Sequence, residues 1–210
     1  MQAGLFAELD DGPVGLRLGG SLGLAEDDLL YVRDFISKAA ADAFFDVLLR
    51  DTPWTQERIR IYGEEHDLPR LTAWFGDPGA SYTYSGIRQE PHPWTPTLLA
   101  IRQLVEAFSA HRFNSVLLNL YRTGSDRVGW HADDEPEFGD RPVIASVSLG
   151  ASRRFKVRQK SDPKKAIGLD LEHGSLLLMR GDLQRLCEHE VPRTAKVVGQ
   201  RINLTFRYVA

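Results

Sequence analysis

The chain has 210 residues, of which 42% are hydrophobic and 26% charged, with a formal net charge of −3. This composition is typical of one globular domain with a sizeable core, and it excludes strong overall basicity, so any nucleic-acid contact must rest on local patches. No apolar run approaches the ~20 residues of a membrane span, and we expect no membrane partner. The single cysteine excludes internal disulfides, and the first residues lack a signal-peptide pattern; together they predict a cytoplasmic protein.

Two helices are predicted in the first half of the chain. Residues 1–32 are expected to form an irregular or short-stranded arm. Ser37 is a candidate N-cap for a helix that runs to about Arg50. A second helix is expected to start at Thr95 and Pro96, a capping residue followed by proline at the first helical position.

Short β-rich segments dominate the second half, separated by glycine, proline or charged turns. They are residues 115–121, 141–149, 153–159, 174–179 and 201–209. Helices followed by a run of strands favour an α+β fold with the sheet curled into a sandwich or barrel.

A histidine and several carboxylates gather in "VGWHADDEPEFGD", residues 128–140. If this segment is a strand, His131 and Asp133 point to the same face and can reach one metal ion. They would supply two of the three ligands of a facial triad on Fe(II). The alternative is a pair of polar residues at a strand end.

The third ligand must come from a distant segment. His189 in "CEHEVP" is the best candidate, and His173 in "EHGSLL" is its rival because it precedes a turn. Cys187, two residues before His189, is expected to pack in the core, since free cysteine is among the most buried residue types.

Polar residues alternate along the last strand and along residues 115–121. The four on one face of the last strand are Arg201, Asn203, Thr205 and Arg207. Asn119 and Tyr121 repeat the alternation. Buried arginines bind planar anions, so these two strands predict a site for a small dicarboxylate. The alternative is a surface strand with solvent-reaching arginines.

These segments together resemble the AlkB family of Fe(II)/2-oxoglutarate-dependent dioxygenases over residues 55–209. The matching stretches include "NSVLLNLYRTGSDRVGWHADDEP", "PVIASVSLGASRRF", "HGSLLLM", "EHEVP" and "RINLTFR". The resemblance implies a double-stranded β-helix, or jelly roll, with flanking N-terminal helices, and Fe(II), 2-oxoglutarate and O2 as cofactor and co-substrates. It puts the metal ligands on His131, Asp133 and His189, and the 2-oxoglutarate contacts on Asn119, Tyr121, Arg201, Asn203 and Arg207.

The implied activity is oxidative demethylation of 1-methyladenine and 3-methylcytosine in DNA, a direct-reversal repair by a protein expected to be monomeric. The dioxygenase domain would span residues 51–210, with a nucleotide-recognition segment at about 55–90. Residues 1–50 would form the N-terminal arm and helix, outside the resemblance.

The base must leave its stack before the reaction, and five residues are predicted to bind the nucleic acid: Tyr62, Tyr82, Tyr84, Glu135 and Arg70. Tyr84 would stack on the flipped base opposite His131, with Tyr82 and Glu135 at the base edges. Ordinary sheet packing is the alternative for the two tyrosines.

Tyr62 is a candidate wedge in a hairpin that fills the gap left by the base. Arg70 and the cations of residues 153–165 would contact phosphates. A solvated charged face is the alternative for this basic stretch.

Only Arg193 and Lys196 stand in "VPRTAKVVGQ", where the family branch that acts on duplex DNA has a run of three basic residues. A single-stranded substrate, DNA or RNA, is therefore favoured. Two other functions stay open: the same iron chemistry on methylated RNA or protein, and a non-catalytic jelly roll that binds nucleic acid.

Overall fold

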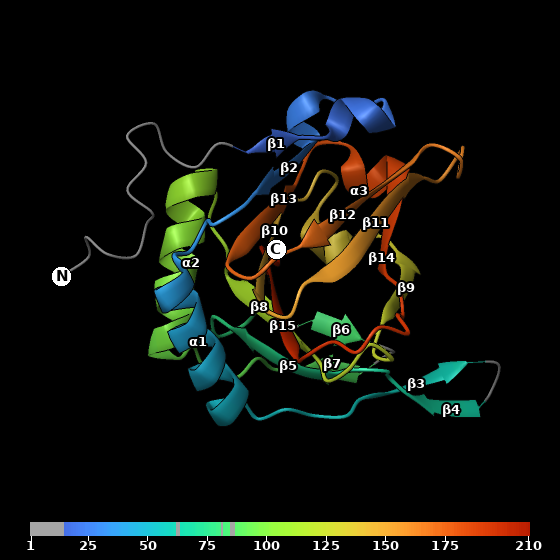
Figure 1. The fold of residues 1–210 in the computed structure, drawn as a ribbon. Helices are drawn as coiled ribbons and strands as arrows, with labels where there is room; N and C mark the ends of the chain where they lie inside the picture. The colour runs from blue at the N-terminus through green and yellow to red at the C-terminus, as the bar shows by residue number, and fades with distance from the viewer. Residues whose placement is uncertain (1–14, 62–63, 81, 85–86) are drawn as a thin grey trace.

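The computed structural model describes residues 15–61, 64–80, 82–84 and 87–210. Most strands lie in two antiparallel sheets, and two long helices cover the outer side of the larger one (Figure 1). The expected α+β class is confirmed. No helix in these ranges is long and apolar enough to cross a bilayer.

The larger sheet has seven strands in the order β1-β2-β13-β10-β15-β8-β5, all paired antiparallel. Their bounds are Leu16–Arg17 (β1), Leu29–Val32 (β2), Leu71–Gly76 (β5), Ser115–Tyr121 (β8), Ile144–Gly150 (β10), Ser175–Met179 (β13) and Arg201–Arg207 (β15). The first two strands lie within the predicted arm, so that part of the arm extends the edge of the sheet.

The smaller sheet has four strands in the order β12-β11-β14-β9. They are Val128–His131 (β9), Arg153–Gln159 (β11), Ala166–Leu171 (β12) and Cys187–Val191 (β14). Two hairpins complete the strands: Arg58–Ile61 (β3) with Glu64–Asp67 (β4), and Tyr82–Tyr84 (β6) with Ile87–Gln89 (β7). The hairpins lie beside the lower end of the sheets in Figure 1.

The two long helices are Lys38–Asp51 (α1) and Pro96–Ser109 (α2), and a single turn, Leu183–Leu186 (α3), precedes β14. Short 3₁₀ turns occur at Gly19–Leu22, Glu26–Asp28 and Pro136–Phe138. Thr95 caps α2 as predicted, since its Oγ1 accepts from the Leu98 N–H at 3.3 Å. Ser37 does stand at the N-cap of α1, but its side chain makes no capping hydrogen bond.

The core has two main parts, one on each side of the larger sheet. Ile202, Leu204 and Phe206 of β15 pack on the helix side. On the inner side, Tyr121 of the larger sheet meets Val157 of the smaller one. Because side chains alternate along a strand, the polar residues of β15 point into the space between the sheets, where the candidate site lies.

Candidate metal and co-substrate site

Three possible metal ligands meet beside the smaller sheet. One ligand atom from each of His131, Asp133 and His189 lies within 4.8 Å of the other two. Antiparallel pairing of β9 and β14 sets His131 directly opposite His189, and the ring centroids are 4.3 Å apart. Two imidazoles and one carboxylate at this spacing suit a single Fe(II) ion with open positions for other ligands.

Asp133 reaches the triad by a route other than the predicted one. We expected it on the same strand face as His131, but β9 ends at His131 and Asp133 lies in the following loop. Two hydrogen bonds hold it there: its backbone N–H donates to Gln184 Oε1 at 3.0 Å, and Arg207 Nη2 donates to its Oδ1 at 2.8 Å. The strand-based reason was therefore wrong, although the three side chains do come together.

Gln184 is a functional residue that no pattern in the sequence indicates. It lies on α3 between Leu183 and Arg185, in a segment that reads as an ordinary polar turn, yet it is only 1% exposed. Its side-chain NH2 lies 3.6 Å from the sulfur of Met179, which leaves the carbonyl oxygen facing Asp133. This contact fixes the loop that carries a metal ligand.

The electrostatics keep the triad in its metal-binding form. Burial and the charge of His131 lower the pKa of His189 to about 3, so its imidazole is neutral at physiological pH. Burial disfavours ionisation of Asp133, but the pKa of Asp133 still lies below its ordinary value, and the charge of Arg207, which also donates a hydrogen bond to the carboxylate, makes the largest contribution to that lowering. Neutral imidazole and ionised carboxylate are the forms that coordinate metals.

A small cavity of about 60 Å³ adjoins the triad between the two sheets. The polar residues that line it from β8 and β15 are Asn119, Tyr121, Arg201, Asn203, Thr205 and Arg207. The β8–β15 register pairs Asn119 with Asn203 and Tyr121 with Arg201. The predicted alternation on both strands is confirmed, and it gathers these side chains around one space.

The hydrogen-bond partners of Arg201 indicate whether this cavity suits a dicarboxylate. Its side chain is 1% exposed, Nη2 donates to Ser148 Oγ at 2.9 Å, and Nε and Nη1 have no hydrogen-bond partner within the described residues. Burial lowers the pKa of Arg201, an effect that nearby Tyr121 opposes. A guanidinium stays charged at physiological pH, and a buried cation with two unused donors is costly without an anion. A carboxylate in the cavity would satisfy it.

A larger cleft of about 690 Å³ also reaches the triad. His131, Asp133 and Arg207 line both the cleft and the inner cavity. Many of the remaining cleft residues come from the predicted nucleotide-recognition segment: Glu57, His66, Asp67, Leu68, Pro69, Arg70, Thr72 and Trp74. The triad therefore stands between a small polar cavity and a wide opening to solvent.

The predicted substrate residues divide into those that the structure places and those that it does not. Glu135 and Arg70 line the cleft. Tyr62 lies outside the described residues. Tyr82 and Tyr84 form the ends of β6, but their side chains are outside the described part of the chain, so the stacking role stays a prediction.

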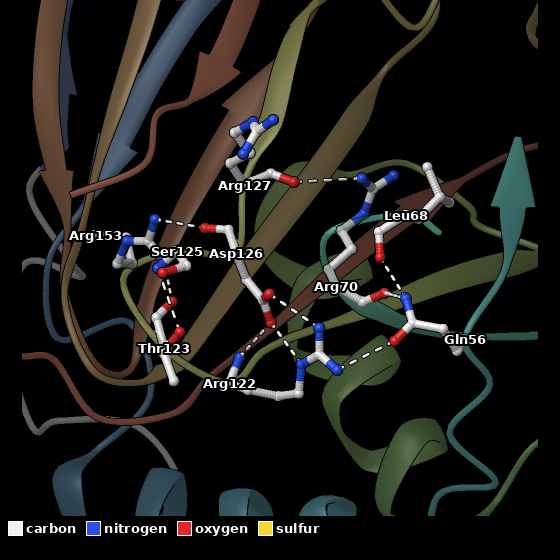
Figure 2. Close-up of polar contacts among 9 residues, drawn as sticks. All are labelled: Gln56, Leu68, Arg70, Arg122, Thr123, Ser125, Asp126, Arg127 and Arg153. Carbon is white, nitrogen blue, oxygen red and sulfur yellow. Dashed lines mark hydrogen bonds and ion pairs between the residues drawn. The ribbon is translucent and has the colours of Figure 1, made fainter. Parts of the chain in front are cut away.

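The loop between β8 and β9, residues 122–127, is held by a dense set of hydrogen bonds (Figure 2). The carboxylate of Asp126 accepts from Arg122 Nε at 2.8 Å and from Nη2 at 3.0 Å. Arg153 reaches in from β11 and donates to the carbonyl oxygens of Thr123 and Asp126, at 3.1 and 2.8 Å. The two strands that carry Asn119, Tyr121 and His131 are thus joined by a rigid connection.

Most cations of the basic stretch 153–165 have partners within the protein, and their contact with phosphates stays a prediction. Arg153 is buried and bonds to backbone carbonyls. Four others form ion pairs, namely Arg154 with Asp170, Lys156 with Glu190, Arg158 with Glu188 and Lys160 with Asp134. The acidic partners come from neighbouring strands and from the loop after β9, so the sequence of the stretch alone could not reveal them.

His173, the rival candidate for the third metal ligand, and Cys187 both have structural roles outside the metal-binding triad. His173 Nδ1 accepts the Gly150 N–H at 2.8 Å, and its Nε2 lies 3.0 Å from Asp42 Oδ1. These contacts tie the β12–β13 turn to β10 and α1, away from the triad. Cys187 is buried in the core between the sheets, as expected, and burial raises the pKa of its thiol.

Comparison with known proteins identifies the class to which this fold and triad belong. The 2OG-Fe(II) oxygenase superfamily matches residues 28–207. Among solved structures, that titled "The structure of OsALKBH1" aligns with a TM-score of 0.64 at 20% identity, covering 86% of this chain and 96% of that one. An oxidoreductase of the 2OG-Fe(II) oxygenase family from Burkholderia pseudomallei aligns with a TM-score of 0.56 at 16% identity, covering 90% and 88%. These structures support the jelly-roll fold.

Closer relatives are found by sequence. The chain is 43% identical to the alpha-ketoglutarate-dependent dioxygenase alkB homolog 3 of Bos taurus over 83% of this chain and 64% of the relative. It is 39% identical to the DNA oxidative demethylase ALKBH2 of Homo sapiens over 82% of this chain and 70% of the relative. The chain belongs to the AlkB family of the 2OG-Fe(II) oxygenase superfamily, whose cofactor is Fe(II) and whose co-substrates are 2-oxoglutarate and O2. It spans just under two thirds of the length of the first of these relatives.

Proposed function

We propose that this protein removes methyl groups oxidatively from N-alkylated bases in DNA, with 1-methyladenine and 3-methylcytosine as substrates. The observation that carries the proposal is the position of His131 and Asp133, which line both the polar inner cavity and the wide cleft. One space suits a small dicarboxylate and the other a base brought out of its stack. Similarity to proteins named DNA oxidative demethylase supports DNA as the polymer.

The chain's own residues divide the work between the two spaces. His131, Asp133 and His189 would hold Fe(II), and Arg201 would bind the distal carboxylate of 2-oxoglutarate with its unused donors. Asn119, Tyr121, Asn203 and Arg207 would hold the rest of the co-substrate. When bound, iron with 2-oxoglutarate and O2 supplies the oxidation of the N-methyl group, and the protein supplies geometry and exclusion of water.

The cleft would receive the base. Glu135 lines it near the triad and would accept hydrogen bonds from the base edge. Residues 55–90 would form the nucleotide-recognition segment, a role supported by the many cleft-lining residues between Glu57 and Trp74. Tyr82 and Tyr84 would add stacking surface from β6, and Tyr62 a wedge.

A single-stranded substrate is part of the proposal. Phosphate contacts need free cations, and five of the seven cations in residues 153–165 are engaged by carboxylates or backbone carbonyls. A protein with few free cations at this surface suits a single strand better than a duplex. We also propose that the protein acts as a monomer. The large hydrophobic side chains exposed in the described residues, among them Leu16, Leu99 and Leu186, stand on separate elements.

The test is the mass of a 3-methylcytosine oligonucleotide, single-stranded and duplex, after incubation with protein, Fe(II), 2-oxoglutarate and air. Loss of one methyl group only when 2-oxoglutarate is present, and faster on the single strand, is the expected result. No loss on either DNA, with 2-oxoglutarate still consumed, would rule out the DNA substrate and leave methylated RNA and protein to be assayed.

A further inference from the structure

Arg70, which precedes β5, stands between the cleft and the inner cavity and lines both. Its Nε donates to Asn119 Oδ1 at 2.6 Å, a contact that crosses from the start of β5 to the neighbouring strand β8. Asn119 is 6% exposed and lines the inner cavity. The arginine predicted to bind substrate is thus joined to a residue of the co-substrate cavity.

This contact decides which way the amide of Asn119 points. A guanidinium only donates hydrogen bonds, so the atom of Asn119 that faces Arg70 must be the carbonyl oxygen. The NH2 group is then turned away from Arg70, and its one contact among the described residues is a long 3.5 Å approach to Asn203 Oδ1. A flipped amide would present its oxygen to a carboxylate in the cavity, which is repulsive, whereas the observed orientation offers N–H donors.

Arg70 is itself held in place. Gln56 Nε2 donates to the carbonyl oxygens of Leu68 and Arg70, the latter at 3.3 Å, and Gln56 Oε1 accepts from Arg122 Nη1 at 3.1 Å (Figure 2). Arg70 Nη1 approaches the carbonyl oxygen of Arg127 at 3.5 Å. The backbone and the guanidinium of Arg70 are both anchored to the β8–β9 loop, so the side chain can impose an orientation on Asn119.

We propose that Arg70 is a positioning residue for the co-substrate: it locks Asn119 with its amide N–H groups toward the inner cavity, where they bind a carboxylate of 2-oxoglutarate. The inference rests on the proposed function for the identity of that ligand. In this role Arg70 acts on the co-substrate through Asn119. The sequence predicted a different role for Arg70, contact with the nucleic acid.

The experiment measures the dissociation constant of 2-oxoglutarate by calorimetry on the 210-residue chain loaded with Mn(II) in the absence of oxygen. In Arg70→Met, which removes the donors but keeps an unbranched side chain, we expect binding to weaken about tenfold, the size of one hydrogen bond to a charged group. The matched control is Arg127→Met, which removes the same charge beside the same cleft without touching Asn119. It should bind 2-oxoglutarate as wild type does, and all variants should bind Mn(II) equally.

A double-mutant cycle separates action through Asn119 from a general loss of charge or packing. Asn119→Leu removes the amide, so adding Arg70→Met to it should weaken 2-oxoglutarate binding no further. Additive losses, or equal effects of Arg70→Met and Arg127→Met, would overturn the inference. Absence of 2-oxoglutarate binding in the wild-type protein would instead overturn the proposed function, so the two failures are distinguishable.

Discussion

Two strands of this protein carry rows of cations, and the two rows have opposite surroundings. On β15, Arg201 and Arg207 point into the space between the sheets, where both keep buried nitrogen atoms without a partner in the described chain. On the outward face of β11, Arg158 donates to Glu188 Oε1 at 2.6 Å and covers the ring of Trp130 at 3.9 Å. The outer cation has a carboxylate partner in the protein, whereas Arg201 has none among the described residues and Arg207 pairs with Asp133 but keeps its Nε unpartnered.

The difference shows how to tell a ligand site from a structural charge. A buried cation costs several kcal/mol unless an anion is near, so unused donors around a cavity indicate a missing anion. Cations that already have carboxylate partners indicate only a stable surface. By this criterion β15 belongs to a binding site and β11 to the scaffold, although the sequence of β11 is the more basic of the two.

The largest effect is expected where the inner charges meet the metal. Asp133→Ala removes the only carboxylate of the triad, and we expect Mn(II) or Fe(II) affinity to fall at least 100-fold, with loss of demethylation. The variant should still fold, because two sheets and two core clusters do not depend on this loop. Metal titration and circular dichroism check the two parts, and retained demethylation would contradict the assignment of the triad.

Arg201→Met separates the two roles of a buried cation most directly, because 2-oxoglutarate affinity and the free energy of unfolding are expected to change in opposite directions. We expect 2-oxoglutarate to bind about 100-fold more weakly, as a bidentate charged pair is worth roughly 3 kcal/mol. Without co-substrate, the free energy of unfolding should rise by about 1 kcal/mol, because a buried unpaired cation is gone. Calorimetry and urea unfolding measure the two quantities.

Arg158→Met is the matched outer variant for Arg201→Met. It should leave 2-oxoglutarate binding unchanged and lower the unfolding free energy by about 1 kcal/mol, since the ion pair and the ring contact are partly exposed. The comparison fails if both variants destabilise the protein alike or if the outer variant weakens co-substrate binding.

A smaller effect is expected from a residue that touches the metal loop without being charged. Gln184→Leu keeps the buried volume but removes the acceptor for the Asp133 N–H, and we expect metal affinity to fall about tenfold. Gln184→Glu retains an acceptor oxygen and should bind metal more tightly than Gln184→Leu. Equal metal affinity in the wild type and Gln184→Leu would mean that Asp133 needs no such support.

Asp126 provides a buried charge that is fully partnered, and it predicts a pH dependence. Burial opposes its ionisation, but the hydrogen bonds from Arg122 outweigh this and hold the pKa of Asp126 below 3.8. The stabilisation is therefore complete above pH 3.8 and is lost as the pH falls through the lower pKa of the folded state. Asp126→Asn should cost about 2 kcal/mol at neutral pH and almost nothing at pH 2, as measured by urea unfolding at both values.

Much of this architecture could be read from local patterns. Residues 115–121 and 153–159 were predicted as strands at their observed bounds, because alternation and turn residues are local signals. The same alternation placed Asn119 and Arg201 on the ligand side. The helix that starts after Thr95 followed from its capping residue and proline.

What could not be predicted depends on contacts between distant segments. Nothing near Gln184 in the sequence indicates that it reaches Asp133, because α3 meets the loop only after the sheets close. The partners of Lys156 and Arg158 lie on β14, about 30 residues away, so the basic stretch could not be recognised as paired. The charge of Arg70 is visible in the sequence, whereas its contact with Asn119 depends on the pairing of β5 with β8.

The position of β9 at the end of the smaller sheet has a consequence for the metal-free protein. In the described structure β9 pairs only with β14, so it is the border strand of the smaller sheet. Its other edge has no neighbouring strand in that sheet. A metal bound by His131 and His189 would act as a cross-link that fastens this border strand to its neighbour. Without that link the border strand is held to the sheet by its backbone pairing with β14 alone, so binding of the metal would also fasten this end of the sheet.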